Sequence, residues 1–395
     1  MKKKAVTAAL LAGVMLTLSL TGCGGGSGTG NSAEDSEDDH TMRVAMITDS
    51  GDITDQCFNQ TTYETCKAWS TGNGVEFKYY KPENDSDISR EASVDQAVAD
   101  GANVVVLPGY IFAAAVVDES PLYPDVKFIA LDVGKGDICE KGVRQGYTYN
   151  PDDYEVSDYY NTDNVYCCTY REELSGYMAG YAAVKLGYRH LGFLGGMSVP
   201  AVTRFGYGYV QGADAAAVEL GIADQVTVEY IVGGQFYGDA DITAAMDTWY
   251  KEKGVEVVFA CGGGIYTSVV EAAEKENGKI IGVDSDQSGI IGEELTVTSA
   301  MKGLGATINT VLDAIYAGEW DDYVGKIDNL GIDSENPEEN YVQLPWDTTQ
   351  WSDGFTQDDY KELVKKLYHG EIEVSSDVSQ MPKTTITVKD QGSIK

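Results

Sequence analysis

The chain has 395 residues, more than a compact core of the commonest size holds, so we expect at least two domains. Hydrophobic residues make up 43% of it, which excludes wholesale disorder. The formal net charge is −35, and a surface of that sign repels phosphate backbones and anionic headgroups, so we expect no nucleic acid partner and no direct headgroup binding. Seven cysteines are too few for a disulfide scaffold, and three histidines leave little for a histidine metal site or base.

The N-terminal region has the features of an export signal. Lys2 to Lys4 precede an apolar run over residues 5–20, which is typical of a signal peptide rather than a stable membrane span. The run ends in Leu-Thr-Gly-Cys23, which resembles the bacterial lipobox and implies cleavage after residue 22 and a lipid on the Cys23 thiol. Residues 23–41 are glycine- and serine-rich and then acidic, and predict a flexible tether. The expected location is the extracytoplasmic face of the cell membrane, held by the lipid.

The remaining cysteines have an open pairing. Outside the cytoplasm they are able to form disulfides, and six cysteines allow 15 full pairings, among which the sequence does not choose. They are Cys57, Cys66, Cys139, Cys167, Cys168 and Cys261.

From Met42 onward, short apolar runs alternate with amphipathic stretches, which predicts parallel strands joined by helices. The first series is strand 43–47, helix 58–69, strand 75–80, helix 89–99, strand 103–107, helix 111–119 and strand 127–132. Residues 133–167 are rich in Gly, Asp and Tyr and interrupt the rhythm as an insertion or long connection. The second series is helix 172–186, strand 190–194, helix 204–220, strand 226–231, helix 242–253, strand 255–260, helix 266–276 and strand 279–283. A helix over 300–316 and a strand over 384–388 follow.

Two such series in tandem predict two doubly wound α/β lobes with a ligand cleft between them and more than one crossover. We expect one lobe to contain residues 42–168 and about 298–325. The other is expected to contain residues 169–297 and about 326–395.

Polar and aromatic residues recur where the predicted strands end. Asp49 follows the first strand, with Asp55, Phe58 and Asn59 entering the next helix. The other strand ends carry Asp132, Arg204-Phe205, Gly262-Gly263-Gly264 and Asp284. Each alone has a simpler explanation, such as Asp55 as a helix cap or Phe205 as core. Because carboxyl ends of parallel strands meet at one edge of a sheet, their recurrence favours a binding site.

Several segments, taken in order, resemble the basic-membrane-protein family of bacterial lipoproteins. They are Thr48 to Gln60, Gly109 to Phe112, Tyr170 to Glu173 with Met178 to Ala183, Phe193 to Phe205, and Gly282 to Gln287. The family includes purine-nucleoside receptors of ABC importers. The resemblance covers about residues 42–302 and implies the type I periplasmic-binding-protein fold, with two α/β lobes that close on a ligand.

The resemblance also implies roles for particular residues. Phe58 and Phe205 would sandwich the base, one from each lobe, and Asp49 and Asp132 would accept hydrogen bonds from base N–H groups. Asn59 belongs to the same predicted set. Asp284 would bind the ribose hydroxyls, Gly262 would offer its backbone N–H, and Lys302 would reach the sugar. Cys57 stands where the family commonly has a serine.

We therefore expect a surface lipoprotein that binds inosine, guanosine or adenosine and delivers it to an ABC permease. We expect a monomer that is not an enzyme and holds no cofactor and no metal. A sugar or signal receptor of the same fold remains an alternative. A nucleoside hydrolase is another, because Asp49, Asp52 and Asp55 resemble the acid cluster with which those enzymes hold calcium, although the spacing departs from it.

Overall fold

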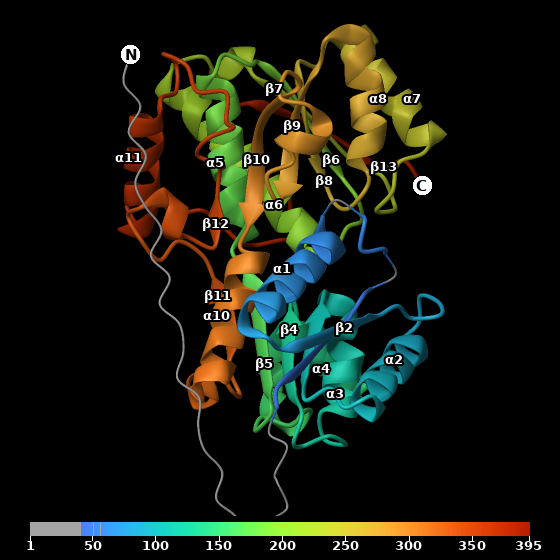
Figure 1. The fold of residues 1–395 in the computed structure, drawn as a ribbon. Coiled ribbons are helices and arrows are strands. Elements are labelled where there is room, and N and C mark those ends of the chain that lie inside the picture. Colours follow the sequence, from blue (N-terminus) through green and yellow to red (C-terminus); the bar gives the residue numbers. More distant parts are fainter. Residues whose placement is uncertain (1–40, 50, 56) are drawn as a thin grey trace, which may run out of the picture. The chain divides into compact units, whose positions relative to one another are not determined.

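The computed structural model describes residues 41–49, 51–55 and 57–395. The predicted signal peptide, the lipidation site Cys23 and the tether up to residue 40 lie outside the described residues. In the described part, strands alternate with helices, and the strands form two sheets (Figure 1).

The first sheet is wholly parallel and has the order β11-β5-β4-β3-β1-β2. Its strands are β1 (Arg43–Ile47), β2 (Glu76–Tyr80), β3 (Val104–Pro108), β4 (Lys127–Leu131), β5 (Val165–Tyr170) and β11 (Ile327–Leu330). The central strand β3 has the sequence VVVLP and is buried along its whole length, as a strand covered by helices on both faces requires.

The second sheet has the order β12-β10-β9-β8-β6-β7-β13, and only β12 pairs antiparallel. Its strands are β6 (His190–Gly195), β7 (Thr227–Val232), β8 (Val257–Cys261), β9 (Lys279–Asp284), β10 (Thr296–Lys302), β12 (Val342–Gln343) and β13 (Thr387–Ser393). The doubly wound α/β class predicted from the alternating pattern is confirmed.

Helices connect the strands of both sheets. They are α1 (Phe58–Asn73), α2 (Asp87–Ala99), α3 (Ala113–Glu119), α4 (Lys135–Val143), α5 (Glu172–Lys185), α6 (Pro200–Glu219), α7 (Ala240–Asp247), α8 (Tyr266–Glu276), α9 (Ser288–Ile291), α10 (Leu304–Ala317) and α11 (Gln357–Tyr368). Local signals set several ends. Ser86 caps α2 by accepting a hydrogen bond from the Ser89 N–H, and α1 stops at Gly74, whose φ of 69° suits glycine.

Helices α5 and α6 cross at close range because each carries two glycines four residues apart. Gly176 and Gly180 on α5 face Gly208 and Gly212 on α6, and a Cβ atom on Gly180 would lie 2.0 Å from the Tyr209 carbonyl oxygen. Only glycine allows the two backbones to approach this closely. This contact anchors α5, which carries the chain from the first sheet to the second.

The structure corrects several predicted boundaries. Residues 133–167, expected to interrupt the alternation as an insertion or long connection, instead continue it, because they contain helix α4 and the first half of β5. Residues 300–302 end strand β10 rather than begin a helix, and the C-terminal strand covers Thr387–Ser393 rather than 384–388. The lobe boundaries change accordingly: β10 belongs to the second sheet, while β11, expected there, pairs with β5 in the first.

The chain passes between the two sheets three times, after β5, after β10 and after β11. The three passages are hydrogen-bonded to one another. Arg171 N donates to Leu330 O, Gly303 N donates to Tyr341 O, and the Ser175 hydroxyl donates to Met301 O. The three crossover segments begin at Arg171, Gly303 and Gly331, directly after β5, β10 and β11, and lie together as one bundle. We call it the crossover bundle.

The described part has no disulfide and no helix that could span a membrane. All six described cysteines are buried free thiols, so none of the 15 pairings is present. Among the described residues, no helix combines the length and apolarity needed to cross a membrane.

Candidate functional site

The ammonium of Lys302, at the end of β10, lies at the centre of a buried charged cluster. Its Nζ is 2.7 Å from Asp132 Oδ2, 3.1 Å from Glu172 Oε1 and 3.9 Å from Asp284 Oδ1. Asp132 follows β4 of the first sheet, whereas Lys302 and Asp284 end strands of the second. The cluster thus joins the carboxyl ends of strands from both sheets, where the sequence placed the site.

Glu172, the first residue of α5, is the best-buried acid of this cluster, with no exposed side chain. Its Oε2 accepts a hydrogen bond of 2.5 Å from Arg204 Nε on α6. Burial raises its pKa, but Lys302 and Arg204 more than offset this and hold the pKa of Glu172 below its usual value. Glu172 is therefore a carboxylate with two cationic partners.

Burial dominates the other two acids. It raises the pKa of Asp132 to about 6, although Lys302 opposes the shift and Glu172 adds to it. Burial also raises the pKa of Asp284. Asp132 Oδ1 is buried without a hydrogen-bond partner among the described residues, which leaves an acceptor available to a bound molecule.

Asp132 and Asp284 share an uncommon backbone conformation. Their φ angles are 59° and 63°, in the left-handed region that side chains other than glycine, asparagine and aspartate rarely adopt. Both stand at a strand end and turn their carboxylates toward Lys302. Such strain collects at functional sites, where the surrounding structure holds it in place.

Three aromatic rings surround the same ammonium. Lys302 Nζ lies 5.3 Å from the ring centre of Phe58, 5.4 Å from that of Tyr170 and 5.6 Å from that of Phe205. Phe58 begins α1 beside the first sheet and Phe205 lies on α6 beside the second. The two predicted aromatics are thus within reach of one atom, and their faces attract a cation.

Cys57 also contacts this cluster from the first sheet's side. Its Sγ donates a 2.9 Å hydrogen bond to Asp284 Oδ2, and the thiol is completely buried. Burial and the neighbouring acids, first Asp284 and then Asp55, raise the thiol's pKa well above its usual value, so it stays protonated and donates. Asp284 therefore has one oxygen toward Cys57 and the other toward Lys302.

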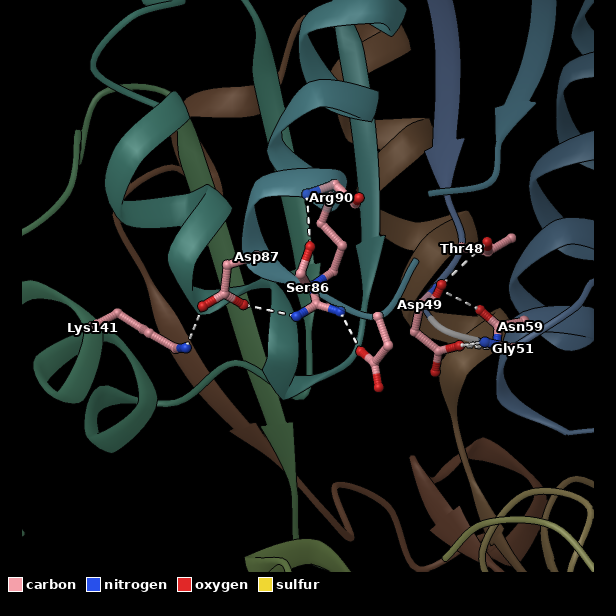
Figure 2. Close-up of polar contacts among 10 residues, drawn as sticks. Thr48, Asp49, Gly51, Asn59, Ser86, Asp87, Arg90 and Lys141 are labelled. Carbon is pink, nitrogen blue, oxygen red and sulfur yellow. Dashed lines mark hydrogen bonds and ion pairs between the residues drawn. The ribbon is translucent and has the colours of Figure 1, made fainter. Parts of the chain in front are cut away.

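The segment after β1 is held by its own acids (Figure 2). Asp49 Oδ1 accepts hydrogen bonds from Gly51 N and from Asn59 Nδ2, while Asp49 N donates to Asn59 Oδ1. Asp55 Oδ2 accepts from Asn59 Nδ2 and Asn59 N, and its Oδ1 accepts from Cys57 N. The side-chain amide of Asn59 therefore bonds to Asp49 through both its oxygen and its nitrogen, and to Asp55 through its nitrogen. These bonds fix the conformation of the segment.

A second network orders the loop before α2 (Figure 2). Arg90, only 5% exposed, bridges Asp85 and Asp87 at 2.7 Å each, and Lys141 of α4 reaches Asp87 at 2.6 Å. These contacts join α2 to α4, the helix that follows Asp132.

Gly262, expected to offer its N–H to a ligand, lies against the side chain of Phe236. A Cβ there would lie 2.9 Å from the Phe236 ring, and the φ of 131° also requires glycine. Gly196 clears space for the same ring, and Gly263 lies against the backbone of Phe236. Phe236, which follows β7, is therefore an aromatic at the strand ends that the sequence motifs did not reveal.

The acids that suggested a calcium site have separate partners. Asp52 pairs with Lys81 at 2.7 Å, Asp55 caps α1 and Asp49 binds Gly51 and Asn59. In residues 41–49, 51–55 and 57–395, no group of three or more His, Cys, Asp or Glu residues is placed to hold a metal.

Most of the predicted site residues lie around this cluster, and three further residues lie there as well. Phe58, Asp132, Phe205, Asp284 and Lys302 converge on one atom. Glu172, Tyr170 and Arg204 complete the surroundings; Glu172 and Tyr170 were not predicted as site residues, and Arg204 was noted at a strand end without a role toward the ligand. All three lie in segments that carry the family resemblance, but local sequence does not tell a buried ionic contact from a surface charge.

Comparison with known proteins gives a consistent assignment. The family model described as "ABC transporter substrate-binding protein PnrA-like" (Bmp) matches residues 42–377. The ABC transporter nucleoside-binding protein BmpA of Lactococcus lactis is 26% identical, with 81% of this chain and 87% of that protein covered. Basic membrane protein B of Borreliella burgdorferi is 25% identical over 70% and 72%, and an uncharacterized lipoprotein of Pyrococcus abyssi is 24% identical over 81% and 73%.

Solved structures of low sequence identity share the fold. An ABC transporter solute-binding protein from Aeropyrum pernix superposes with a TM-score of 0.64 at 19% identity, over 85% of this chain and 94% of that one. A second, from Conexibacter woesei, gives 0.61 at 21% identity over 85% and 99%. The periplasmic-binding-protein type of α/β fold is thereby confirmed, and the chain belongs to the Bmp family of PnrA-like substrate-binding proteins of ABC transporters.

Proposed function

We propose that this protein binds purine nucleosides between the strand ends of its two sheets and delivers them to an ABC permease. The observation that carries the proposal is the convergence of Phe58, Phe205, Asp132 and Asp284 on Lys302 Nζ. The nucleoside-binding name of the Lactococcus lactis relative, at 26% identity, supports the same ligand class.

The residue chemistry suits a neutral ring system that carries a sugar. Phe58 and Phe205 offer faces on which any purine stacks. Asp132 offers the unpartnered acceptor Oδ1 to a base N–H, and Asp284 offers its carboxylate to ribose hydroxyls. Lys302 supplies donors, and Asp49 has its Oδ2 left for a base N–H, because its Oδ1 is occupied by Gly51 and Asn59.

Binding without turnover and a lipid anchor complete the proposal. The Cys57 thiol beside Lys302 stays protonated, because burial and Asp284 raise its pKa, and the described histidines contact Glu229 and Glu335 elsewhere. We propose that a lipid on Cys23 holds the protein, as a monomer, at the extracytoplasmic face. The relatives named lipoprotein in Pyrococcus support that location.

Isothermal titration calorimetry tests the ligand class. The chain is stripped of carried-over ligand by unfolding and refolding, then titrated with inosine, guanosine, adenosine, uridine, ribose and a hexose. Heat with purine nucleosides but not with ribose supports the proposal, whereas heat with the sugars alone replaces it by a sugar receptor. Free base in the mixture, abolished by EDTA, would reveal a hydrolase instead. Asp284→Ala is expected to remove the preference for nucleoside over free base.

A further inference from the structure

Glu172 is the one acid of the charged cluster to which the proposed function gives no contact with the ligand. Its side chain has no exposed area, yet its two oxygens face different cations, Lys302 Nζ at 3.1 Å and Arg204 Nε at 2.5 Å. An isolated carboxylate in such a place would be costly, so the two cations are what keeps it ionised. Conversely, Glu172 determines where both cations lie.

The position of Glu172 in the chain matches this task. It begins α5, where the positive end of the helix dipole favours a carboxylate. Glu172 also lies in the first passage between the sheets, and Lys302 lies at the start of the second. The residue after Lys302, Gly303, donates a hydrogen bond to Tyr341 in the third passage. The ion pair of Glu172 and Lys302 therefore links the crossover bundle to the strand ends.

Asp132 is affected through the shared lysine. The charged and titratable groups that face it are Lys302, Glu172, Asp284, Arg204, Cys168 and Tyr170. Lys302 divides its attraction between Asp132 at 2.7 Å and Glu172 at 3.1 Å. Removing the charge of Glu172 leaves the lysine to Asp132 and takes away a repelling neighbour, so Asp132 becomes easier to ionise.

We propose that Glu172 is a positioning residue of the ligand site, which places the ammonium of Lys302 and tunes the ionisation of Asp132 without touching the ligand. This inference rests on the proposed function. It adds that a residue of the crossover bundle determines both the strength of nucleoside binding and its pH dependence.

The neighbouring residue supplies a matched control. Glu173 is in the same first turn of α5, is 1% exposed and also forms an ion pair, but its partner is Arg171 at 3.0 Å. Burial raises its pKa, as for other acids in this region. A general effect of losing a buried acid at the start of α5 would appear equally in Glu173→Gln and in Glu172→Gln.

The experiment compares wild type, Glu172→Gln, Glu172→Asp and Glu173→Gln as full chains purified in detergent and stripped of ligand. Inosine is titrated by calorimetry between about pH 5 and pH 8, the range in which a buried carboxyl with a raised pKa changes charge. Glu172→Gln is expected to weaken binding at pH 8 by about tenfold, less than a directly broken buried ion pair would give, because Glu172 acts on the ligand only through Lys302. It is also expected to move the acid limb of binding to lower pH. Glu172→Asp should restore part of the affinity, and Glu173→Gln should match wild type.

A ligand-free measurement separates this inference from the proposed function. The carboxyl ¹³C resonance of Asp132, assigned by its loss in Asp132→Asn, is titrated in each variant. Glu172→Gln should lower the Asp132 pKa and Glu173→Gln should not. If wild type binds no inosine while this shift is present, the ligand class is wrong and the positioning role stands. If the Asp132 resonance titrates alike in all variants, or Glu172→Gln binds inosine like wild type, the positioning role is refuted.

Discussion

Replacing Lys302 by methionine tests how the charged cluster holds the strand ends together. Methionine keeps much of the length and volume of the lysine stem but removes the ammonium. The side chain of Lys302 is only 3% exposed, and its Nζ approaches Asp132 at 2.7 Å and Glu172 at 3.1 Å. In the variant Glu172 keeps Arg204, whereas Asp132 loses its only ion-pair partner among the described residues.

The expected loss follows from that orphaned carboxylate. Breaking a buried ion pair from one side costs about 3–5 kcal/mol, because the remaining charge is buried without compensation. The loss should depend on pH. The pKa of Asp132 is already raised to about 6 in the folded protein, against 3.8 as its ordinary value, and loss of Lys302 raises it further. Between the unfolded and folded pKa values the folded state binds the extra proton, so stability falls as pH rises through that window.

Urea unfolding followed by circular dichroism measures this effect at pH 5 and at pH 8. The deficit of Lys302→Met relative to wild type should be larger at pH 8, where Asp132 must ionise, than at pH 5. Lys275→Met is the control: Lys275 is 45% exposed and pairs with Asp247 at 3.0 Å, where solvent screens the charges, so its unfolding should stay close to wild type.

Two results would refute this reasoning. One is a Lys302→Met protein as stable at pH 8 as the Lys275→Met control. The other is a deficit of the same size at both pH values, which would mean that lost packing rather than an orphaned charge causes it.

Three further predictions concern other parts of the molecule. Phe205→Ala should weaken inosine binding by about 1–3 kcal/mol through lost stacking, measured by calorimetry, and unchanged affinity would remove Phe205 from the site. Gly180→Ala should lower the free energy of unfolding by about 3 kcal/mol or more, because its Cβ would lie 2.0 Å from the Tyr209 carbonyl oxygen, while Gly289→Ala, with open space around it, should have little effect in the same urea titration. Burial raises the pKa of Glu119 to about 7, so the contribution of Glu119 to the free energy of unfolding should fall as pH rises from about 4.5 to 7; the slope of stability against pH should therefore differ between wild type and Glu119→Gln over that range, and identical slopes would contradict the assignment.

The alternation of apolar runs and amphipathic stretches was enough to predict the fold class and most strands. A strand such as β3, with the sequence VVVLP, is identifiable because its burial on both faces demands a continuous apolar run. Residues at the strand ends could be predicted equally well, because the carboxyl ends of all parallel strands lie at the same edge of their sheet. Asp132 and Asp284 are identifiable in this way from their positions after predicted strands alone.

Elements whose stability comes from distant partners were predicted less well. Residues 300–302 continue an apolar pattern into α10, and only the pairing of β10 with β9 and β12 makes them a strand. Helix α4 is short and contains Gly136 and Gly142, which weaken a local helix signal. Tyr159 packs where Gly142 lacks a side chain, a contact from outside the helix.

The sequence by itself therefore determined the two-sheet α/β plan and the acids and aromatics at the strand ends, since these depend on periodicity and chain order, while the family followed from the resemblance of particular segments. Tertiary structure alone decided which of them meet. The contact of Lys302 with Asp132 spans 170 positions, and that of Cys57 with Asp284 spans 227. The burial of Glu172 between Lys302 and Arg204 depends on the α5–α6 crossing and on the crossover bundle. Charge pairing in a buried cluster is a property of three-dimensional proximity, and no local pattern records it.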